Sequence, residues 1–288
     1  MSLATTFVRY GSLVKISHTV FALPFALSAA VLASDYGHLT WQKVLLIIFC
    51  VASARTAAMA FNRLIDRDID AKNPRTASRE LPSGALSVMS VRLLVFASCA
   101  AFVAGAAALG RLPLMLSPIA LAVVLGYSYT KRFTALCHVV LGAALAIAPG
   151  GAWIAMGAPV TLVPWLLCLA VATWVGGFDI FYSLQDQDFD RDHSLHSIPV
   201  ALGVKGALWA SGLLHVATVA CLLTAGLLLG RGMGYLAGVA LVAAILVYEH
   251  AIVKPSDLSR INMAFFDLNG YVSVGFFACV LVDQYLIR

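Results

Sequence analysis

The chain contains repeated apolar runs that approach the length needed to cross a lipid bilayer. A helix needs about twenty consecutive, mostly apolar residues to span the hydrocarbon core. Gly, Pro or charged residues separate the runs. The spans that we expect are residues 17–34, 41–62, 91–110, 113–129, 135–156, 161–183, 204–229, 233–250 and 263–286. The sequence therefore predicts a polytopic membrane protein with about nine transmembrane helices.

These spans predict helices and not the strands of a β-barrel. The apolar runs are continuous, whereas barrel strands alternate between apolar and polar residues. A helix also satisfies its own backbone hydrogen bonds, which lipid requires of each isolated span. With 61% hydrophobic and 11% charged residues, we expect an all-α fold in which residues 1–288 form a single transmembrane domain.

The distribution of basic residues indicates how the chain is oriented. Residues 1–16 contain Arg9 and Lys15 without a convincing cleavage site, so we expect a cytoplasmic start and no removable signal. Nine crossings then place four loops in the cytoplasm: residues 63–90, 130–134, 184–203 and 251–262. These loops hold ten basic residues: Arg63, Arg67, Lys72, Arg75, Arg79, Lys131, Arg132, Arg191, Lys254 and Arg260.

The opposite side keeps four basic residues: Lys43, Arg111, Arg231 and Arg288. This asymmetry follows the positive-inside rule. The formal net charge of +5 is therefore read as a topology signal, and no nucleic-acid partner is expected. We expect an integral protein of the bacterial inner (plasma) membrane whose active site faces the cytoplasm. The six Cys are scattered singly without metal-ligand spacing, which is typical of small buried hydrophobes.

Two polar triplets repeat the same spacing of four residues: Asn62, Asp66 and Asp70, then Tyr182, Asp186 and Asp190. On a helix this spacing stacks each triplet along one face. The triplets are separated by a constant 120 positions, which indicates a weak internal duplication. Its parallel halves would be about residues 1–134 and 135–288. Parallel repeats often bind their ligand where the halves meet.

Like charges stacked in this way repel each other unless a cation lies between them. Mg²⁺ is the leading candidate, because it prefers carboxylate oxygens and is usually completed by the phosphate oxygens of a substrate. The expected metal ligands are Asp66, Asp70, Asp186 and Asp190. The alternative is a solvated, charged loop that only determines topology.

Basic residues near both triplets fit a diphosphate. Lys72, Arg75 and Arg79 follow the first triplet, and Lys131 and Arg132 end the fourth span, where they could bind phosphate oxygens. Arg55 lies seven residues before the first triplet and deeper in the membrane. An ionisable residue there is a candidate for function.

The two triplets and their basic neighbours resemble the motifs of the UbiA superfamily of intramembrane aromatic prenyltransferases. The first Asp-rich motif of the family is matched by Asn62, Asp66 and Asp70, and the second by Asp179, Tyr182, Asp186 and Asp190. RTASRELPSG at 75–84 and YSYTKRF at 127–133 resemble elements of the quinone-forming members. Two positions depart from the common pattern. Arg63 stands where many members have Asp, and His18, in the first-span sequence KISHTVFALPFA, stands where ubiquinone-pathway members often have Pro. This first span resembles more closely the branch tied to the futalosine route of menaquinone synthesis.

The resemblance implies Mg²⁺-dependent transfer from a polyprenyl diphosphate to an aromatic acid, in ubiquinone or menaquinone biosynthesis. The acceptor would be 4-hydroxybenzoate or a naphthoate. It further implies that Asp179 orients the hydroxyl of the acceptor or takes its ring proton, with a structural pairing to Arg55 as the alternative. The catalytic candidates are Asp179, Arg55 and Tyr182. The substrate-binding candidates are Asn62, Lys72, Arg75, Arg79, Tyr127, Lys131 and Arg132.

The allylic cation that forms when the donor ionises needs a closed apolar cavity, and Tyr127, Phe178 and Tyr182 could offer it aromatic faces. His193 and His196 lie in a loop that could act as a lid, although plain loop residues are the simpler interpretation. A haem, chlorophyllide or ether-lipid acceptor remains open, as does an ion-coupled transporter. The prenyl length and the oligomeric state also remain open.

Overall fold

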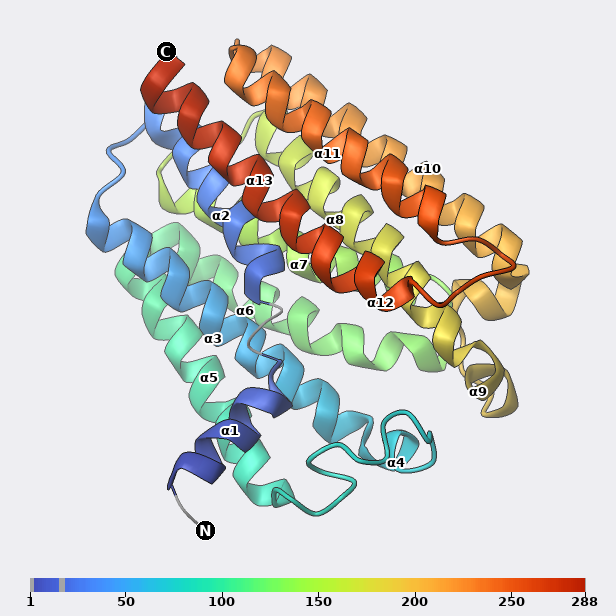
Figure 1. The fold of residues 1–288 in the computed structure, drawn as a ribbon. Coiled ribbons are helices and arrows are strands. Elements are labelled where there is room, and N and C mark those ends of the chain that lie inside the picture. The colour runs from blue at the N-terminus through green and yellow to red at the C-terminus, as the bar shows by residue number, and fades with distance from the viewer. Residues whose placement is uncertain (1–2, 16–18, 288) are drawn as a thin grey trace.

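The computed structural model describes residues 3–15 and 19–287, which form a helical bundle (Figure 1). His18 lies outside the described residues. Within the described ranges the secondary structure is helical, without a strand longer than one isolated bridge. Eight helices in these ranges are long and apolar enough to cross a membrane. A further apolar helix, within residues 21–35, is shorter. The expectation of an all-α membrane fold is confirmed, and the count of nine spans is approximate.

The elements follow the expected spans closely. The longer helices are α1 (Leu3–Leu13), α2 (Thr19–Leu32), α3 (Trp41–Ile65), α5 (Val88–Leu109), α6 (Arg111–Gly126), α7 (Cys137–Ala155), α8 (Leu162–Ser183), α10 (Ile198–Leu228), α11 (Met233–Ile252) and α13 (Asn269–Val282). The short elements are η2 (Ala33–Asp35), α4 (Arg67–Asp70), η3 (Tyr127–Arg132), η4 (Leu184–Asp186), α9 (Gln187–Asp192), α12 (Ile261–Met263) and the π-helical turns η5 (Ala264–Leu268) and η6 (Asp283–Ile287).

One helix begins earlier than expected. We expected the seventh span to start at residue 204, but α10 already starts at Ile198, capped by the Ser197 side chain, which accepts from Val200 N. The expected boundary coincides with Gly203, whose φ of 66° interrupts the helical conformation. Glycine adopts this left-handed region without the steric penalty of a Cβ. The first turn of α10 is therefore angled separately from its membrane-spanning part.

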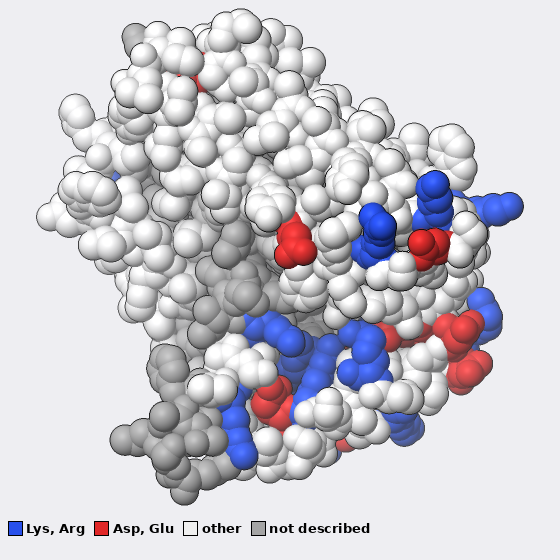
Figure 2. Space-filling view, viewed as in Figure 1, with Lys and Arg blue, Asp and Glu red and all other residues white. Residues whose placement is uncertain are grey.

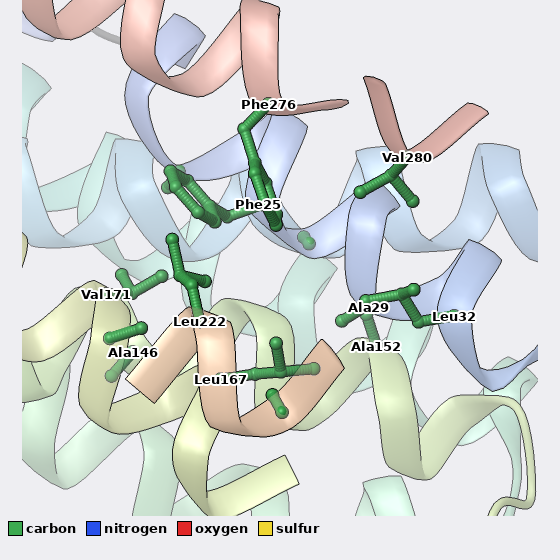
Figure 3. Close-up of a cluster of buried hydrophobic side chains, with 14 of the residues drawn as sticks. Phe25, Ala29, Leu32, Ala146, Ala152, Leu167, Val171, Leu222, Phe276 and Val280 are labelled. Atoms are coloured by element: carbon green, nitrogen blue, oxygen red, sulfur yellow. The ribbon is translucent and has the colours of Figure 1, made fainter. Parts of the chain in front are cut away.

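Helix α8 lies at the centre of the bundle, between α7 and α10 (Figure 1). Its contact with α7 is close because Gly142 has no side chain: a Cβ there would lie 2.1 Å from the Ala172 carbonyl oxygen. Small residues let membrane helices approach in this way. Aromatic and aliphatic side chains of α2, α7, α8, α10 and α13 then fill the core, as Figure 3 shows around Phe25, Val171 and Phe276.

Helix α3 packs mainly against α5 and lies at the edge of the bundle (Figure 1). The ends of α3 and α8 that carry the acidic triplets continue into the short helices α4 and α9, on the same end of the molecule. Figure 2 shows that charged side chains gather at this end of the visible face, whereas the rest of the face is almost entirely uncharged. A charged end and an apolar body suit a protein that presents its site at the edge of a membrane.

Candidate active site

A cavity of about 850 Å³ opens between α3, α5, α6, α7 and α8. Its body is lined mostly by aliphatic residues of α5, α6 and α7, together with small residues of α3. Its polar end is formed where α3 and α8 finish, and both acidic triplets line it. The cavity therefore joins a long apolar compartment to a highly charged one.

The first triplet lies on a helix that is interrupted at its first acidic residue, Asp66. Helix α3 ends at Ile65, and Asp66 leaves the helical conformation (φ −90°, ψ 2°) before α4 begins. Asp66 N still donates to Asn62 O (2.9 Å) and Asp70 N to Asp66 O (2.7 Å). The spacing of a helix is thus kept across the break, and the Asn62 side chain donates to Asp66 Oδ2 at 3.0 Å.

Both carboxylates of this triplet are buried and bound by cationic side chains. Asp66 is 3% exposed and accepts from Lys131 Nζ and Arg132 Nη2, each at 3.0 Å. Asp70 is 4% exposed and binds Arg79 Nη1, which lies 2.8 Å from both carboxylate oxygens. Buried carboxylates are tolerated when they are paired and hydrogen-bonded in this way. The basic residues predicted to bind phosphate therefore reach the acidic residues predicted to bind metal.

The second triplet is joined to the loop that follows the first. Arg75 donates from Nε and Nη2 to the two oxygens of Asp186, the Nε contact being 2.8 Å, and from Nη1 to Tyr182 Oη at 2.9 Å. Asn73 Nδ2 adds a hydrogen bond to Asp186 Oδ1 at 3.0 Å. Burial lowers the pKa of Arg75, but its hydrogen bonds and charge attraction to Asp186 outweigh burial and raise that pKa above its usual value.

Asn73 was not among the sequence candidates. Its Oδ1 accepts from Arg75 N at 2.9 Å, which forms a side-chain turn ahead of the arginine. The Asn73-Pro74 dipeptide is a known turn signal, so the turn could have been predicted. Its contact with Asp186, 113 positions away, could not.

The carboxylate of Asp179 lies deeper along α8 and also lines the cavity. The structure gives it a partner that the sequence did not suggest: His138 Nδ1, at 2.7 Å. Arg55, the alternative partner considered from the sequence, instead donates to the backbone oxygens of Val14 (3.1 Å) and Lys15 (2.8 Å). Arg55 thereby connects α3 to the end of α1 while it lines the cavity.

Aromatic rings form one wall near the polar end. The Tyr182 ring stacks on Phe265, with centroids 4.2 Å apart and an interplanar angle of 27°. Phe178 meets Phe265 edge to face at 5.3 Å. Phe265 belongs to the π-helical turn η5, so its direction could not be predicted from a regular helical period. Tyr127 lines the cavity from η3, across from α8.

Most of the sequence candidates lie together. Twelve line the cavity: Arg55, Asn62, Asp66, Asp70, Arg75, Arg79, Tyr127, Lys131, Asp179, Tyr182, Asp186 and Asp190. Arg132 does not line it but binds Asp66 from behind. Lys72 is exposed and does not line it. Arg63, where the sequence departs from the family pattern, is buried at the cavity wall and donates to Asn62 Oδ1 at 3.3 Å.

The donor set at the polar end is compatible with Mg²⁺. Across residues 3–15 and 19–287, no three His, Cys, Asp or Glu side chains are close enough to form a ready metal cage. Mg²⁺ seldom uses such a cage, since it keeps several waters and takes one or two carboxylates together with substrate phosphates. Two sets of carboxylates that line one cavity, with cationic side chains beside them, meet that requirement.

Known proteins are similar in sequence to this chain over most of its length. The model of the UbiA prenyltransferase family matches residues 22–272. The 4-hydroxybenzoate octaprenyltransferase of Citrobacter koseri is 32% identical over 223 residues, which are 77% of this chain and 76% of that protein. The 4-hydroxybenzoate octaprenyltransferase of Aliivibrio salmonicida is 30% identical over 277 residues, 94% of this chain and 93% of that protein.

Solved structures share the fold. A UbiA homologue from Aeropyrum pernix K1, in its apo form, superposes with a TM-score of 0.85 at 38% identity, covering 93% of this chain and 98% of the other. A UbiA homologue from Archaeoglobus fulgidus bound to GPP and Mg²⁺ superposes with a TM-score of 0.72 at 20% identity, covering 95% of this chain and 99% of the other.

Proposed function

The chain belongs to the UbiA prenyltransferase family and is an integral membrane prenyltransferase, and we propose that it transfers a polyprenyl group from a polyprenyl diphosphate to an aromatic acid that is a quinone precursor. The proposed acceptor is 4-hydroxybenzoate, which the relatives of about 30% identity are named for. A naphthoate of the futalosine route is the second candidate, favoured by the first-span sequence KISHTVFALPFA.

The observation that carries this proposal is a single cavity whose apolar body ends between the two acidic triplets. A polyprenyl chain needs an apolar compartment, and its diphosphate needs cations and a metal at the polar end. The cavity has both, in that order. A soluble aromatic acid could reach the junction from the charged end, which we propose faces the cytoplasm of a bacterial inner membrane.

The charged residues would exchange partners when the donor binds. In the structure, Asp66 is bound by Lys131, Asp70 by Arg79, and Asp186 by Arg75. We expect these three cationic side chains to move toward phosphate oxygens, which Arg can bind in bidentate fashion. The carboxylates that would then hold Mg²⁺ are Asp66, Asp70, Asp186 and Asp190. When bound, the metal would supply charge neutralisation at the leaving diphosphate, worth several kcal/mol.

The remaining residues would protect and direct the allylic cation. Its carbon loses the bond to the diphosphate oxygen and forms a new bond to a ring carbon of the acceptor. Phe178, Tyr182 and Tyr127 line the cavity beside this position and can present aromatic faces to a cation. The ring carbon then releases its proton, and Asp179 is the proposed acceptor of that proton, which restores the aromatic ring.

The test is a transfer assay with purified protein in detergent, Mg²⁺ and a polyprenyl diphosphate. Offering 4-hydroxybenzoate and a dihydroxynaphthoate side by side, with EDTA as the control, decides between the acceptors. Prenylation of 4-hydroxybenzoate that EDTA abolishes is the expected result. Metal-dependent binding of the donor without transfer to either acid would refute the acceptor class and favour a haem, chlorophyllide or ether-lipid acceptor.

An ion-coupled transporter is the alternative from a different class. It predicts ionisable groups near the bilayer midplane, whereas the acidic triplets lie at the ends of α3 and α8. Ion flux into proteoliposomes that required Asp66 and Asp186, without any prenyl transfer, would favour the transporter and refute the enzyme proposal.

A further inference from the structure

The pair formed by His138 and Asp179 has a geometry that the sequence did not suggest. We propose that His138 is a positioning residue that holds one oxygen of Asp179, so that the other oxygen accepts the proton from the aromatic ring. This inference rests on the proposed function, because it concerns the last step of prenyl transfer to an aromatic acid. It adds a residue from α7 to the polar side chains of the site, which come from α3, α4, η3, α8 and the segments that follow them.

The hydrogen bonds of His138 determine which nitrogen carries its proton. The Ile198 backbone N–H points at His138 Nε2, at 3.4 Å. A nitrogen that accepts a hydrogen bond carries no proton, so in the neutral ring the proton is on Nδ1. His138 Nδ1 therefore donates to Asp179 Oδ2 across 2.7 Å. The Ile198 N–H at the start of α10 thus sets the tautomer and the orientation of the His138 ring. Asp179 therefore accepts a hydrogen bond from a donor whose direction is fixed.

Close helix packing keeps the two side chains at this distance. Gly142 lies one turn after His138 on α7, and a Cβ there would lie 2.1 Å from the Ala172 carbonyl oxygen of α8. Gly176 lies three residues before Asp179, and a Cβ there would lie 3.4 Å from the His138 carbonyl oxygen. The glycines thus let the two backbones approach beside the pair. The His138 side chain is almost fully buried, whereas Asp179 keeps 22% of its side-chain surface exposed.

The exposed part of Asp179 contributes to the cavity wall. Oδ2 is occupied by His138, and within the described residues no hydrogen bond reaches Oδ1. A carboxylate held in this way has one oxygen for orientation and one for the substrate. In the proposed step, the ring carbon–hydrogen bond breaks, its electron pair returns to the ring, and the proton forms a bond to Oδ1. His138 keeps its own proton throughout.

A purely structural role for His138 would have different consequences. The pair links the starts of α7 and α10 to α8, so its loss could simply loosen the bundle. Loosening would impair every step, including binding and ionisation of the donor. Mispositioning Asp179 would slow only proton removal from the acceptor, which comes after the donor has ionised. The isotope effect of the ring proton separates these cases.

The experiment compares three variants with the wild-type enzyme: His138→Leu, His138→Asn and, as the control, His193→Leu. Asn places an N–H near the position of Nδ1, whereas Leu has none. His193 lies outside the cavity lining and contacts the Phe189 backbone. Each variant is assayed with protonated and ring-deuterated acceptor, and donor hydrolysis is measured without acceptor. Thermal unfolding in detergent confirms that each variant is folded.

For His138→Leu we expect kcat to fall at least tenfold. This loss is smaller than the rate enhancement of about 10²–10⁴-fold that general acid–base catalysis typically contributes. The KM for the acceptor and the rate of donor hydrolysis should stay near wild type. A primary isotope effect should appear or increase, His138→Asn should recover most of kcat, and His193→Leu should match the wild type.

Two results would overturn the inference. The first is an unchanged kcat in folded His138→Leu. The second is a fall in kcat that is matched by an equal fall in donor hydrolysis, without an isotope effect and without recovery in His138→Asn. Either result leaves the proposed function intact, provided that the wild type prenylates an aromatic acid. If the wild type prenylates none, the proposed function fails and the inference fails with it.

Discussion

The two acidic segments have the same spacing but reach the cavity in different ways. On α8, 13 of 22 residues are buried, whereas only 7 of 25 are buried on α3. Conversely, the carboxylates after α3 are more buried than Asp186 after α8: the side chains of Asp66 and Asp70 are 4% and 6% exposed, whereas that of Asp186 is 16% exposed. The second segment thus follows the more buried helix, whereas the first segment carries the more buried carboxylates.

This difference in burial reflects how each segment is held in place. Helix α8 is positioned by its packing between α7 and α10, so its acidic end can stay partly open to a ligand. Helix α3 lies at the edge, and its acidic end is held by ion pairs to Lys131, Arg132 and Arg79. The Arg75 side chain then joins the two segments through Asp186. We expect that changes in each segment affect activity equally but stability unequally.

The largest effect is expected on activity, where the segments should not differ. If both carboxylate sets hold Mg²⁺ with the diphosphate, then Asp66→Asn and Asp186→Asn should each lower kcat/KM by about 10²–10³-fold, as for other groups that stabilise charge in a transition state. EDTA should abolish transfer in the wild type. A transfer assay with saturating acceptor measures this. An Asp66→Asn enzyme with near-wild-type kcat/KM would show that the first segment binds no metal.

Stability should distinguish the same two substitutions. Asp66→Asn leaves Lys131 and Arg132 facing a neutral amide in a buried site, and breaking a buried ion pair typically costs about 3–5 kcal/mol. We expect about 2–3 kcal/mol here, because both cations keep access to water, and about 1 kcal/mol or less for Asp186→Asn. Thermal unfolding of the metal-free proteins in detergent measures the difference. Equal losses would contradict the contrast between buried and open carboxylates.

The packing of the two helices can be compared through two glycines. A Cβ at Gly142 would meet the α8 backbone at 2.1 Å, whereas a Cβ at Gly105 would meet the Cys50 and Phe49 side chains of α3 at 2.7 and 2.9 Å. Side chains can rotate away but backbone cannot, so we expect Gly142→Ala to cost about 2 kcal/mol and Gly105→Ala about 1 kcal/mol or less. Unfolding midpoints in detergent provide the measurement, and the reverse order would refute the central role of α8.

The smallest effect tests the loop that joins the segments. Arg75→Lys keeps the charge but loses the bidentate contact with Asp186 and the bond to Tyr182, so we expect kcat/KM to fall about tenfold, or about 1.4 kcal/mol. Lys72→Ala is the matched comparison three residues away. Because Lys72 is exposed and outside the cavity lining, it should change kcat/KM less than about threefold. A larger loss in Lys72→Ala than in Arg75→Lys would restore Lys72 as the phosphate ligand that the sequence suggested.

Several parts of the site could be predicted because they repeat or carry charge in an apolar chain. The acidic triplets and their basic neighbours stood out, and the structure places the triplets and most of these neighbours around one cavity. His138 could not be found in this way, because a single His in an apolar span is not distinguishable from a buried structural residue. Phe265 was missed for another reason: it lies on a π-helical turn, where the helical period that guides face assignments does not hold.

The sequence by itself determined the membrane class, the helical spans and the candidates for the charged end, since these depend on length, composition and spacing along one segment. The tertiary structure decided the partners: Arg75 with Asp186, Lys131 with Asp66, and His138 with Asp179. The physical reason is that periodicity specifies which side of a helix a residue occupies, whereas the partner on that side depends on how closely two backbones pack. At α7 and α8 that distance is set by the missing side chain of Gly142.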